Sequence, residues 1–238
     1  MPDDTRTHRA PPPRPFVLGI SGASGAVYSL RLLDLLLRNG HDVHLVVSDY
    51  GRRLLFDEAG IKNLTPEELL GGRATAQGSS SDLRNSGTPE LPSLRNSGTS
   101  ELPSGTLFIH PNKDVGALIA SGSFLHGGMV ILPCSSATLG AVATGSGSNL
   151  LCRAAAVTLK ERRPLIVCHR EMPLSLIDIR NMESLALAGA TICSPNPGFY
   201  LHPTRIEDIV DFVVGKVLDH LGVSHALKTR WEDHTRRD

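Results

Sequence analysis

A glycine-rich stretch near the N-terminus, Gly19-Ile-Ser-Gly-Ala-Ser-Gly-Ala26, contains the first residues that could bind a ligand. It joins a short apolar run to an amphipathic segment, as a turn joins a strand to a helix. Glycines let the backbone approach a ligand, and the free amides and dipole of a helix start favour negative charge. With the hydroxyls of Ser21 and Ser24, the stretch predicts a phosphate site. The alternative is a tight strand-to-helix turn that binds nothing.

Polar and small residues also follow the later apolar runs. We expect these residues at the carboxyl ends of parallel strands, which meet at one edge of a sheet, where ligands bind in such folds. Each also has a purely structural interpretation, with Ser48 as a helix cap and Arg170 with Glu171 as a solvated ion pair of little energetic value. Their shared edge favours a phosphate-bearing ligand. The candidates are Gly22, Ala23, Ser24, Ser48, Ser135, Ser136, Ala137, Thr138, Arg170, Glu171 and the loop 195–200.

Two cations are placed differently. Arg153 and Lys160 are seven positions apart in one predicted helix, so they share a face of it. Lys160 also belongs to the sequence Lys160-Glu-Arg-Arg163, which closes that helix, where cations interact favourably with the helix dipole. A purely structural role for Lys160 therefore stays open.

The elements that must position these residues alternate regularly along the chain. The predicted strands are 17–20, 43–47, 129–132, 165–168 and 191–193. The predicted helices are 27–38, 49–59, 115–120, 139–144, 149–162, 174–188 and 205–221, with a helix start at Thr65–Glu68. Capping boxes are expected from Thr65 with Glu68 and from Thr204 with Glu207. The alternation predicts an α/β fold, a Rossmann-like (flavodoxin-like) three-layer sandwich around a parallel sheet.

The 238 residues fit one domain, which we place at 16–223. Residues 1–15 are expected to be a disordered tail without a signal peptide, and 224–238 a C-terminal tail in which the role of Trp231 is open. The segment 71–105 is rich in Gly, Ser, Thr and Pro and holds two copies of one motif, starting at Leu83 and Leu94. Its low apolar content predicts a flexible surface insertion that takes no part in the chemistry.

Composition excludes several classes of function. Lys plus Arg and Asp plus Glu number 24 each, and no basic stripe is interleaved with aromatic residues, so we expect neither nucleic acid nor a membrane surface as partner. No apolar run approaches the ~20 residues that span a bilayer. The four cysteines lack zinc-site spacing, which favours reduced cysteines, no metal and a cytoplasmic protein.

Five blocks, taken in order, resemble the UbiX-type flavin prenyltransferases of the homo-oligomeric flavoprotein superfamily. They are Gly19–Ala26, Ile131–Ser135, Arg153–Leu165, Arg170–Pro173 and Pro197–Pro203. The resemblance implies transfer of a dimethylallyl group from dimethylallyl phosphate to N5 and C6 of reduced FMN, without a metal. It also implies that the product, prenylated FMN, serves UbiD-type decarboxylases, and that the protein is a homododecamer with sites at subunit interfaces.

Roles follow from the resemblance, residue by residue. It implies that Glu171 protonates the departing phosphate, Glu58 acts as a base for the flavin proton and Ser24 tunes the reactive flavin nitrogen. FMN would be held by Gly22, Ala23, Ser24, Ser48, Ser135, Ser136, Ala137, Thr138 and Arg170. The prenyl phosphate would be gripped by Lys160, Arg170, Tyr200 and Lys216, with Arg153 contributed by a neighbouring subunit.

Three other functions stay open. The spacing of Gly19, Gly22 and Gly25 also resembles NAD(P)-dependent reductases, although the chain has no Tyr-x-x-x-Lys dyad. A hydrolase elbow is excluded, because Gly22-Ala-Ser-Gly-Ala26 lacks the last glycine of GxSxG. An FMN-dependent cysteine decarboxylase of the same superfamily is the nearer alternative, and a non-enzymatic FMN carrier is the third.

Overall fold

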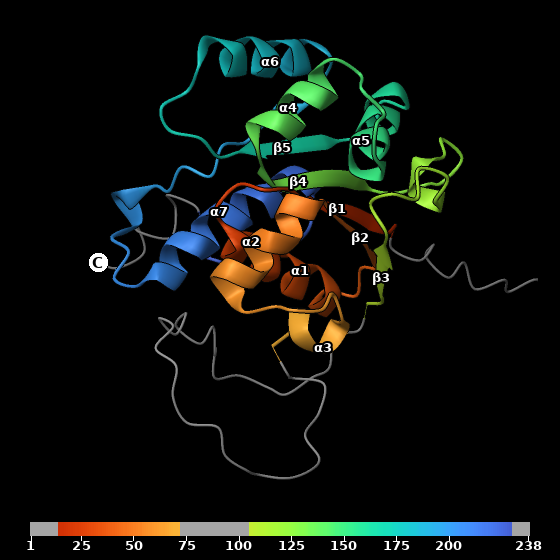
Figure 1. The fold of residues 1–238 in the computed structure, drawn as a ribbon. Helices are drawn as coiled ribbons and strands as arrows, with labels where there is room; N and C mark the ends of the chain where they lie inside the picture. The colour runs from red at the N-terminus through yellow and green to blue at the C-terminus, as the bar shows by residue number, and fades with distance from the viewer. Residues whose placement is uncertain (1–13, 72–104, 230–238) are drawn as a thin grey trace, which may run out of the picture.

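The fold is built on one parallel sheet of six strands, in the order β3-β2-β1-β4-β5-β6 (Figure 1). The computed structural model describes residues 14–71 and 105–229. This strand order is that of the Rossmann doubly wound fold, so the predicted fold class is confirmed. The strands are β1 (Phe16–Ile20), β2 (Val43–Val47), β3 (Leu107–His110), β4 (Gly128–Cys134), β5 (Leu165–His169) and β6 (Thr191–Ile192).

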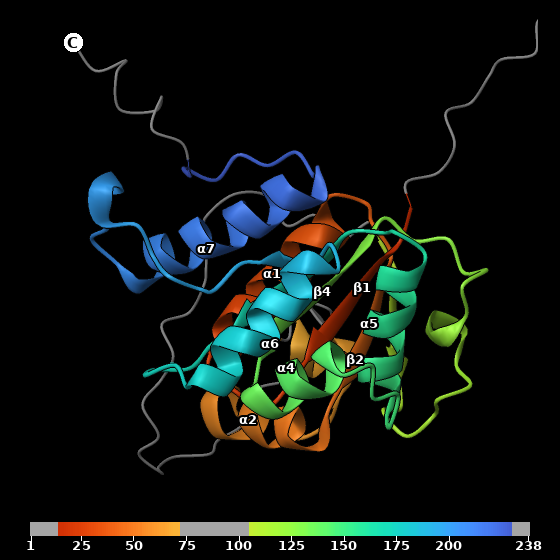
Figure 2. The same ribbon diagram turned by 90° about the horizontal axis from the view of Figure 1, so that it is seen from above.

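Helices cover both faces of the sheet because successive side chains of its buried central strand point to opposite faces. Leu18 and Ile20 of β1 pack into one apolar core, and Val17 packs into the other. Figures 1 and 2 show the two helical layers. One layer contains α1 (Ala26–Arg38), α2 (Asp49–Ala59), α3 (Pro66–Leu69) and α7 (Ile206–Leu221); the other contains α4 (Ser136–Ala143), α5 (Leu150–Lys160) and α6 (Leu176–Leu187).

The sequence reading missed one strand and overextended one helix. The edge strand β3 pairs with β2 alone, and its apolar run, Leu107-Phe108-Ile109, is only three residues long and partly exposed. The helix predicted at 115–120 is only a short 3-10 turn, η1 (Leu118–Ala120). Its first residues instead form turns around Asp114, whose carboxylate accepts the Gly116 amide at 3.2 Å.

Both predicted capping boxes need correction. Thr65 caps α3 as expected, but the Glu68 carboxylate turns back to the amides of Lys62 and Asn63, at 2.7 and 2.9 Å. At α7 the cap residue is Arg205 rather than Thr204. Its partner is Asp208 rather than Glu207, because Asp208 lies three residues after the true cap and reaches the amides of both Thr204 and Arg205.

The described part of the predicted C-terminal tail packs on α7. Thr229 is buried, and its side chain lies directly over Gly215, where a Cβ would collide with it. Residues 224–229 therefore belong to the folded domain. Residues 1–13, 72–104 and 230–238 lie outside the described part, and with them nearly all of the predicted N-terminal tail and of the insertion, as well as Trp231. Among the described residues, no helix is long and apolar enough to cross a membrane.

Candidate functional site

The direction of strand order reverses between β1 and β4, and in doubly wound folds ligands bind at that point, beyond the carboxyl ends of the strands. Ser21 ties the two strand ends together there. Its hydroxyl donates to the carbonyl of Pro133 at 3.1 Å and accepts the Ser135 amide at 2.8 Å. Because Ser21 is fully buried and used in this way, its predicted role as a phosphate-binding hydroxyl is not supported.

A carboxylate of the chain itself already occupies the start of α1. The carboxylate of Glu58, on α2, accepts the amides of Gly25 and Ala26, each at 2.9 Å. The donors that the sequence reading assigned to a ligand phosphate are thus engaged within the chain, and a phosphate on this turn would meet a carboxylate. The phosphate must therefore be sought elsewhere on the same edge. The base role predicted for Glu58 stays a prediction.

Gly22 is required by the packing of the chain itself. A Cβ at this position would collide with the Cβ of Tyr50, in the first turn of α2. Ser48 caps α2 by accepting the Gly51 amide at 3.0 Å, so its simple structural reading is correct, whatever else it binds. Ala23 is buried between two exposed residues, Gly22 and Ser24. The exposed side chain of Ser24 is available to a ligand.

The start of α4 has backbone amides that can donate to a ligand. Ser135 caps the helix by accepting the Thr138 amide at 3.4 Å, and its own hydroxyl lies 3.2 Å from that of Thr138. The amides of Ser136 and Ala137 are the first two of the helix, so no carbonyl within the helix can accept them. Two amides and the dipole of an eight-residue helix make this the better anion site of the edge.

Arg170 and Glu171 follow β5 on the same edge. The Arg170 amide donates to the Cys134 carbonyl at 3.1 Å, and its half-buried side chain has a buried Nε with no hydrogen-bond partner among the described residues. A buried donor without an acceptor is costly, which suits a residue that receives an anionic ligand. Glu171 is exposed and, among the described residues, accepts only the Met172 amide, at 3.2 Å. In the described part of the chain, the open alternative of an Arg170–Glu171 ion pair is not formed.

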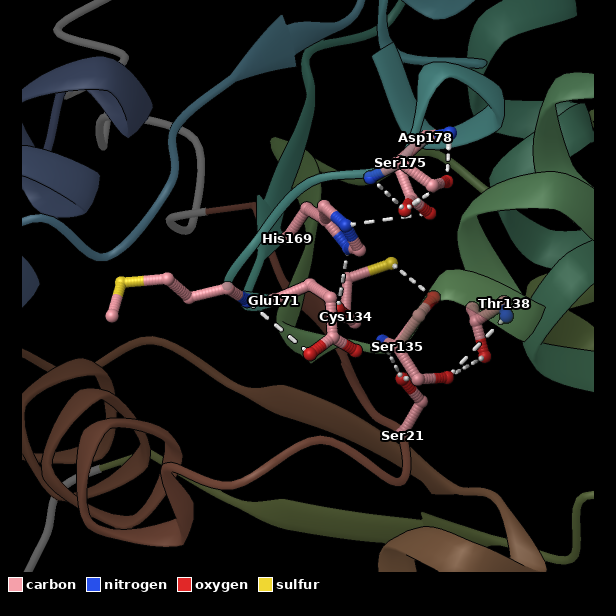
Figure 3. A network of polar contacts seen from close by, with 9 residues as sticks. Ser21, Cys134, Ser135, Thr138, His169, Glu171, Ser175 and Asp178 are labelled. Carbon is pink, nitrogen blue, oxygen red and sulfur yellow. Dashed lines mark hydrogen bonds and ion pairs between the residues drawn. The ribbon is translucent and has the colours of Figure 1, made fainter. Parts of the chain in front are cut away.

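His169 and Asp178 join these elements, and the sequence reading missed both (Figure 3). The Nδ1 atom of His169 lies 3.0 Å from the Cys134 carbonyl oxygen, and its Nε2 atom lies 3.7 Å from Oδ1 of Asp178. Hydrogen bonds from Ser175 and then Ser136 lower the pKa of Asp178. The signal in the sequence was a histidine at the polar end of a buried strand, directly before Arg170.

Tyr200 and Lys216 lie farther along the edge, around α7. The Tyr200 hydroxyl donates to the Thr229 carbonyl at 3.5 Å, and its ring packs edge-on against Phe212. The pKa of Cys193, which follows β6, is lowered by a hydrogen bond from the Cys168 thiol and, to a smaller extent, by the positive charge of Lys216. The structure therefore places Lys216 at the β6 end of the sheet.

Lys160 is not brought to this edge. It ends α5, which leads into the amino end of β5, whereas Arg170 follows the carboxyl end of that five-residue strand. The two ends are separated by about 16 Å at ~3.3 Å per residue.

Lys160 and Arg153 instead line one hollow of about 380 Å³ between α5 and the segment 115–122, so their predicted common face is confirmed. Among the described residues, no cluster of side chains could hold a metal ion.

Comparison with known proteins gives a consistent result. The family model described as Flavoprotein matches residues 4–218. A flavin prenyltransferase UbiX from Halalkalibacterium halodurans is 39% identical, over 93% of this chain and 97% of the relative. Flavin prenyltransferase UbiX from Pseudomonas aeruginosa is 37% identical, over 95% of this chain and 98% of the relative.

Two solved structures are similar over almost the whole chain. One is AnUbiX (PadA1) in complex with FMN and dimethylallyl pyrophosphate, with a TM-score of 0.72, 32% identity, and coverage of 92% of this chain and 97% of that one. The other is a dodecameric FMN-dependent Ubix-like decarboxylase from Escherichia coli O157:H7. It has a TM-score of 0.71 and 32% identity, and the match covers 91% of this chain and 98% of that one.

Proposed function

The chain belongs to the flavoprotein family and to its UbiX-type flavin prenyltransferases, and on this basis we propose that it transfers a dimethylallyl group from dimethylallyl phosphate to reduced FMN. Reduced FMN, when bound, supplies the N5 and C6 atoms that accept the group, and the product is prenylated FMN. The structure similar to this chain with both FMN and dimethylallyl pyrophosphate bound supports this reaction over NAD(P) reduction and over a passive FMN carrier.

One observation carries the placement of FMN. The start of α4 offers two free amides, and the unpartnered Nε of Arg170 lies on the same edge, next to the strand end that leads into α4. We therefore assign the FMN phosphate to Ser135, Ser136, Ala137, Thr138 and Arg170, with Ser48, which follows β2, as an accessory contact. Gly22, Ala23 and Ser24 are then left to contact the rest of the flavin, since Glu58 holds the amides of the first turn of α1.

Glu171 is the proposed acid for the departing phosphate. Its carboxylate is exposed at the edge and makes no ion pair with Arg170 among the described residues, so it is free to carry a proton to a leaving oxygen. Tyr200, Lys216 and Arg170 are the proposed ligands of the prenyl phosphate from the same chain. Cations there would stabilise the charge that develops as the carbon–oxygen bond breaks.

Lys160 and Arg153 are assigned to the site of a neighbouring copy. Within one chain Lys160 lies at the opposite edge of the sheet, so it can assist the reaction only from another subunit. A homododecamer is proposed, in line with the dodecameric relative. Exposed apolar side chains on α6 and the loop before it support burial against other copies: Met172, Leu176, Ile177, Ile179 and Leu187.

The proposed recipient of the product is a UbiD-type decarboxylase, and the proposed compartment is the cytoplasm, where the four free cysteines would stay reduced.

A coupled assay tests the function. The protein is incubated anaerobically with reduced FMN and dimethylallyl phosphate, and the released flavin is added to an apo decarboxylase of the UbiD type. Activation is expected only when both substrates were present. Activation by FMN alone, or none at all, would contradict the proposal.

The nearest alternative is decarboxylation of a cysteine-derived substrate. To test it, a peptide with a C-terminal cysteine is supplied to the FMN-loaded protein, and the released carbon dioxide is measured. We expect none. The proposed prenyl transfer needs cations for a phosphate, and Arg170 and Lys216 lie on the site edge.

A further inference from the structure

His169 is buried between the strand ends of the site, yet none of the roles above uses it. Its Nδ1 atom faces the carbonyl oxygen of Cys134 at 3.0 Å. A carbonyl can only accept, so Nδ1 carries a hydrogen. Its Nε2 atom is buried, has no hydrogen-bond partner within the described ranges of the chain, and faces Oδ1 of Asp178 at 3.7 Å. A carboxylate is also only an acceptor, so this second contact favours a hydrogen on Nε2 as well.

Asp178 brings a negative charge close to the start of α4. It is buried, with 4% of its surface exposed, and its Oδ2 atom accepts the amide and hydroxyl of Ser175 at 3.0 and 2.6 Å. The hydroxyl of Ser136, the first residue of α4, also donates to this carboxylate. All these donors stabilise the ionised form. The carboxylate is therefore one side chain away from the amides assigned to the FMN phosphate, and left alone it would repel a phosphate.

We propose that His169 is a positioning residue, held as an imidazolium between Cys134 and Asp178, that neutralises the Asp178 carboxylate so that the start of α4 can hold the FMN phosphate. This inference rests on the proposed phosphate position. In the described part of the chain, the other ionisable groups close to His169 are Cys168, which precedes it, Arg170 and Glu171, which follow it, and the thiol of Cys134 on β4. Burial raises the pKa of that thiol, so it stays uncharged.

The inference makes the preference for FMN over riboflavin depend on His169, because riboflavin lacks the phosphate. Dissociation constants of both flavins are measured by fluorescence quenching for the wild type and for His169→Asn, Asp178→Asn and the double variant. Asparagine at 169 keeps a donor for the Cys134 carbonyl but carries no charge. We expect His169→Asn to weaken FMN about tenfold, the scale of a lost charge-assisted contact, with riboflavin unchanged.

The double variant gives the decisive readout. Asp178→Asn removes the repelling charge, so the double variant should recover FMN binding to within about twofold of the wild type. A merely structural role predicts the opposite, since two defects in one buried network would weaken both flavins further. Equal weakening of both flavins by His169→Asn, or a double variant worse than the single one, would overturn the inference.

Two controls keep the outcomes distinct. His126 is an equally buried histidine whose Nε2 lies 3.4 Å from the Thr158 hydroxyl, at the opposite end of β4, and His126→Asn should leave the flavin preference unchanged. A wild type that binds riboflavin as tightly as FMN would refute the phosphate position itself. If His169→Asn does not fold, ¹⁵N NMR of the wild type decides, because a neutral His169 ring at pH 7 would overturn the inference.

Discussion

Lys160 and Arg170 stand at opposite ends of one strand, β5, although the sequence reading assigned both to one phosphate. Lys160 ends the helix that leads into the strand and pairs with Glu161 at 3.0 Å, whereas Arg170 follows the strand with a buried, unpartnered Nε. If both residues act on one substrate, they come from different copies of the chain. The arrangement makes the active site a property of the oligomer.

Mixing two inactive variants tests this shared site. Lys160→Ala and Glu171→Gln are each expected to be inactive, but co-expressed they should form some sites with both native residues. Random mixing would restore about one quarter of the wild-type activity, because each site needs an intact Glu171 from one copy and an intact Lys160 from another. Activity is measured per oligomer after purification. No recovery in mixed oligomers would place both residues in one site of one chain, and activity of Lys160→Ala on its own would remove Lys160 from the site.

Glu171→Gln separates chemistry from binding. Because Glu171 makes no ion pair with Arg170 among the described residues, its replacement should leave FMN binding and the melting temperature unchanged. The first carbon–nitrogen bond should form at least ~100-fold more slowly, the usual scale for losing a general acid. Stopped-flow bleaching of the flavin spectrum gives the rate, and titration with dimethylallyl phosphate gives the binding. A glutamine variant with near-normal rates would exclude Glu171 as the acid.

Glu58 has a structural role that any test of its base role must respect. Glu58→Ala should lower the free energy of unfolding by about 1–2 kcal/mol, because two amides at the start of α1 lose their acceptor. Glu58→Gln keeps one acceptor oxygen and should stay closer to the wild type in stability. If Glu58 is also the base, the glutamine variant should still bind FMN but release product ~100-fold more slowly. Normal turnover by a well-folded glutamine variant would leave Glu58 with the capping role alone.

Acid should destabilise the protein through His44. Burial, and then the neighbouring His110, lowers the pKa of His44 to about 4. The ring is 6% exposed and its Nδ1 lies 2.8 Å from Nε2 of His110. A folded-state pKa below the ordinary 6.5 means stability that is present above pH 6.5 and lost as the pH falls toward 4, at most about 3 kcal/mol.

The measurement is the melting temperature of wild type and His44→Phe between pH 7.5 and 4.5, at one protein concentration. Phenylalanine can keep the stacking of His44 on Phe108 and cannot gain a proton. The melting temperature should fall further for the wild type than for the variant as the pH drops from 7.5 to 4.5. Parallel curves for the two proteins would show that His44 does not control acid stability.

The insertion should be dispensable for flavin binding. Its composition cannot form a core, and shortening a surface connection changes the free energy little. The deletion removes residues 72–104 and keeps Gly105, whose amide donates to the Leu37 carbonyl at 2.9 Å and whose missing Cβ leaves room for His41. FMN content and melting temperature are compared with the full chain. A folded deletion variant without FMN would show that the insertion reaches the site.

Apolar periodicity predicted most of the fold, because buried strands and amphipathic helices leave strong local patterns. The bounds of β2 and α2 agree with the prediction to the residue. The sequence prediction missed β3 because its apolar run, Leu107-Phe108-Ile109, is only three residues long. Cap partners were misplaced at Thr65 and Thr204 because several acidic residues stand within reach of each helix start, and only the three-dimensional backbone selects one.

The candidate site was predictable as an edge of the sheet but not as a set of contacts. The sequence shows that Gly25 and Ala26 begin a helix, yet not that Glu58 from the next helix occupies their amides. Nor does it show that Asp178 reaches His169, since that contact spans the separation between β5 and α6. The position of Lys160 could have been predicted, because the last residue of a helix that leads into a parallel strand lies at the amino end of that strand.

The mass of the flavin recovered after anaerobic incubation with reduced FMN and dimethylallyl phosphate tests the central claim most directly. We predict FMN whose mass has risen by one dimethylallyl group, formed only when protein and both substrates are present. Recovery of FMN with unchanged mass, from protein that has bound both substrates, would contradict it.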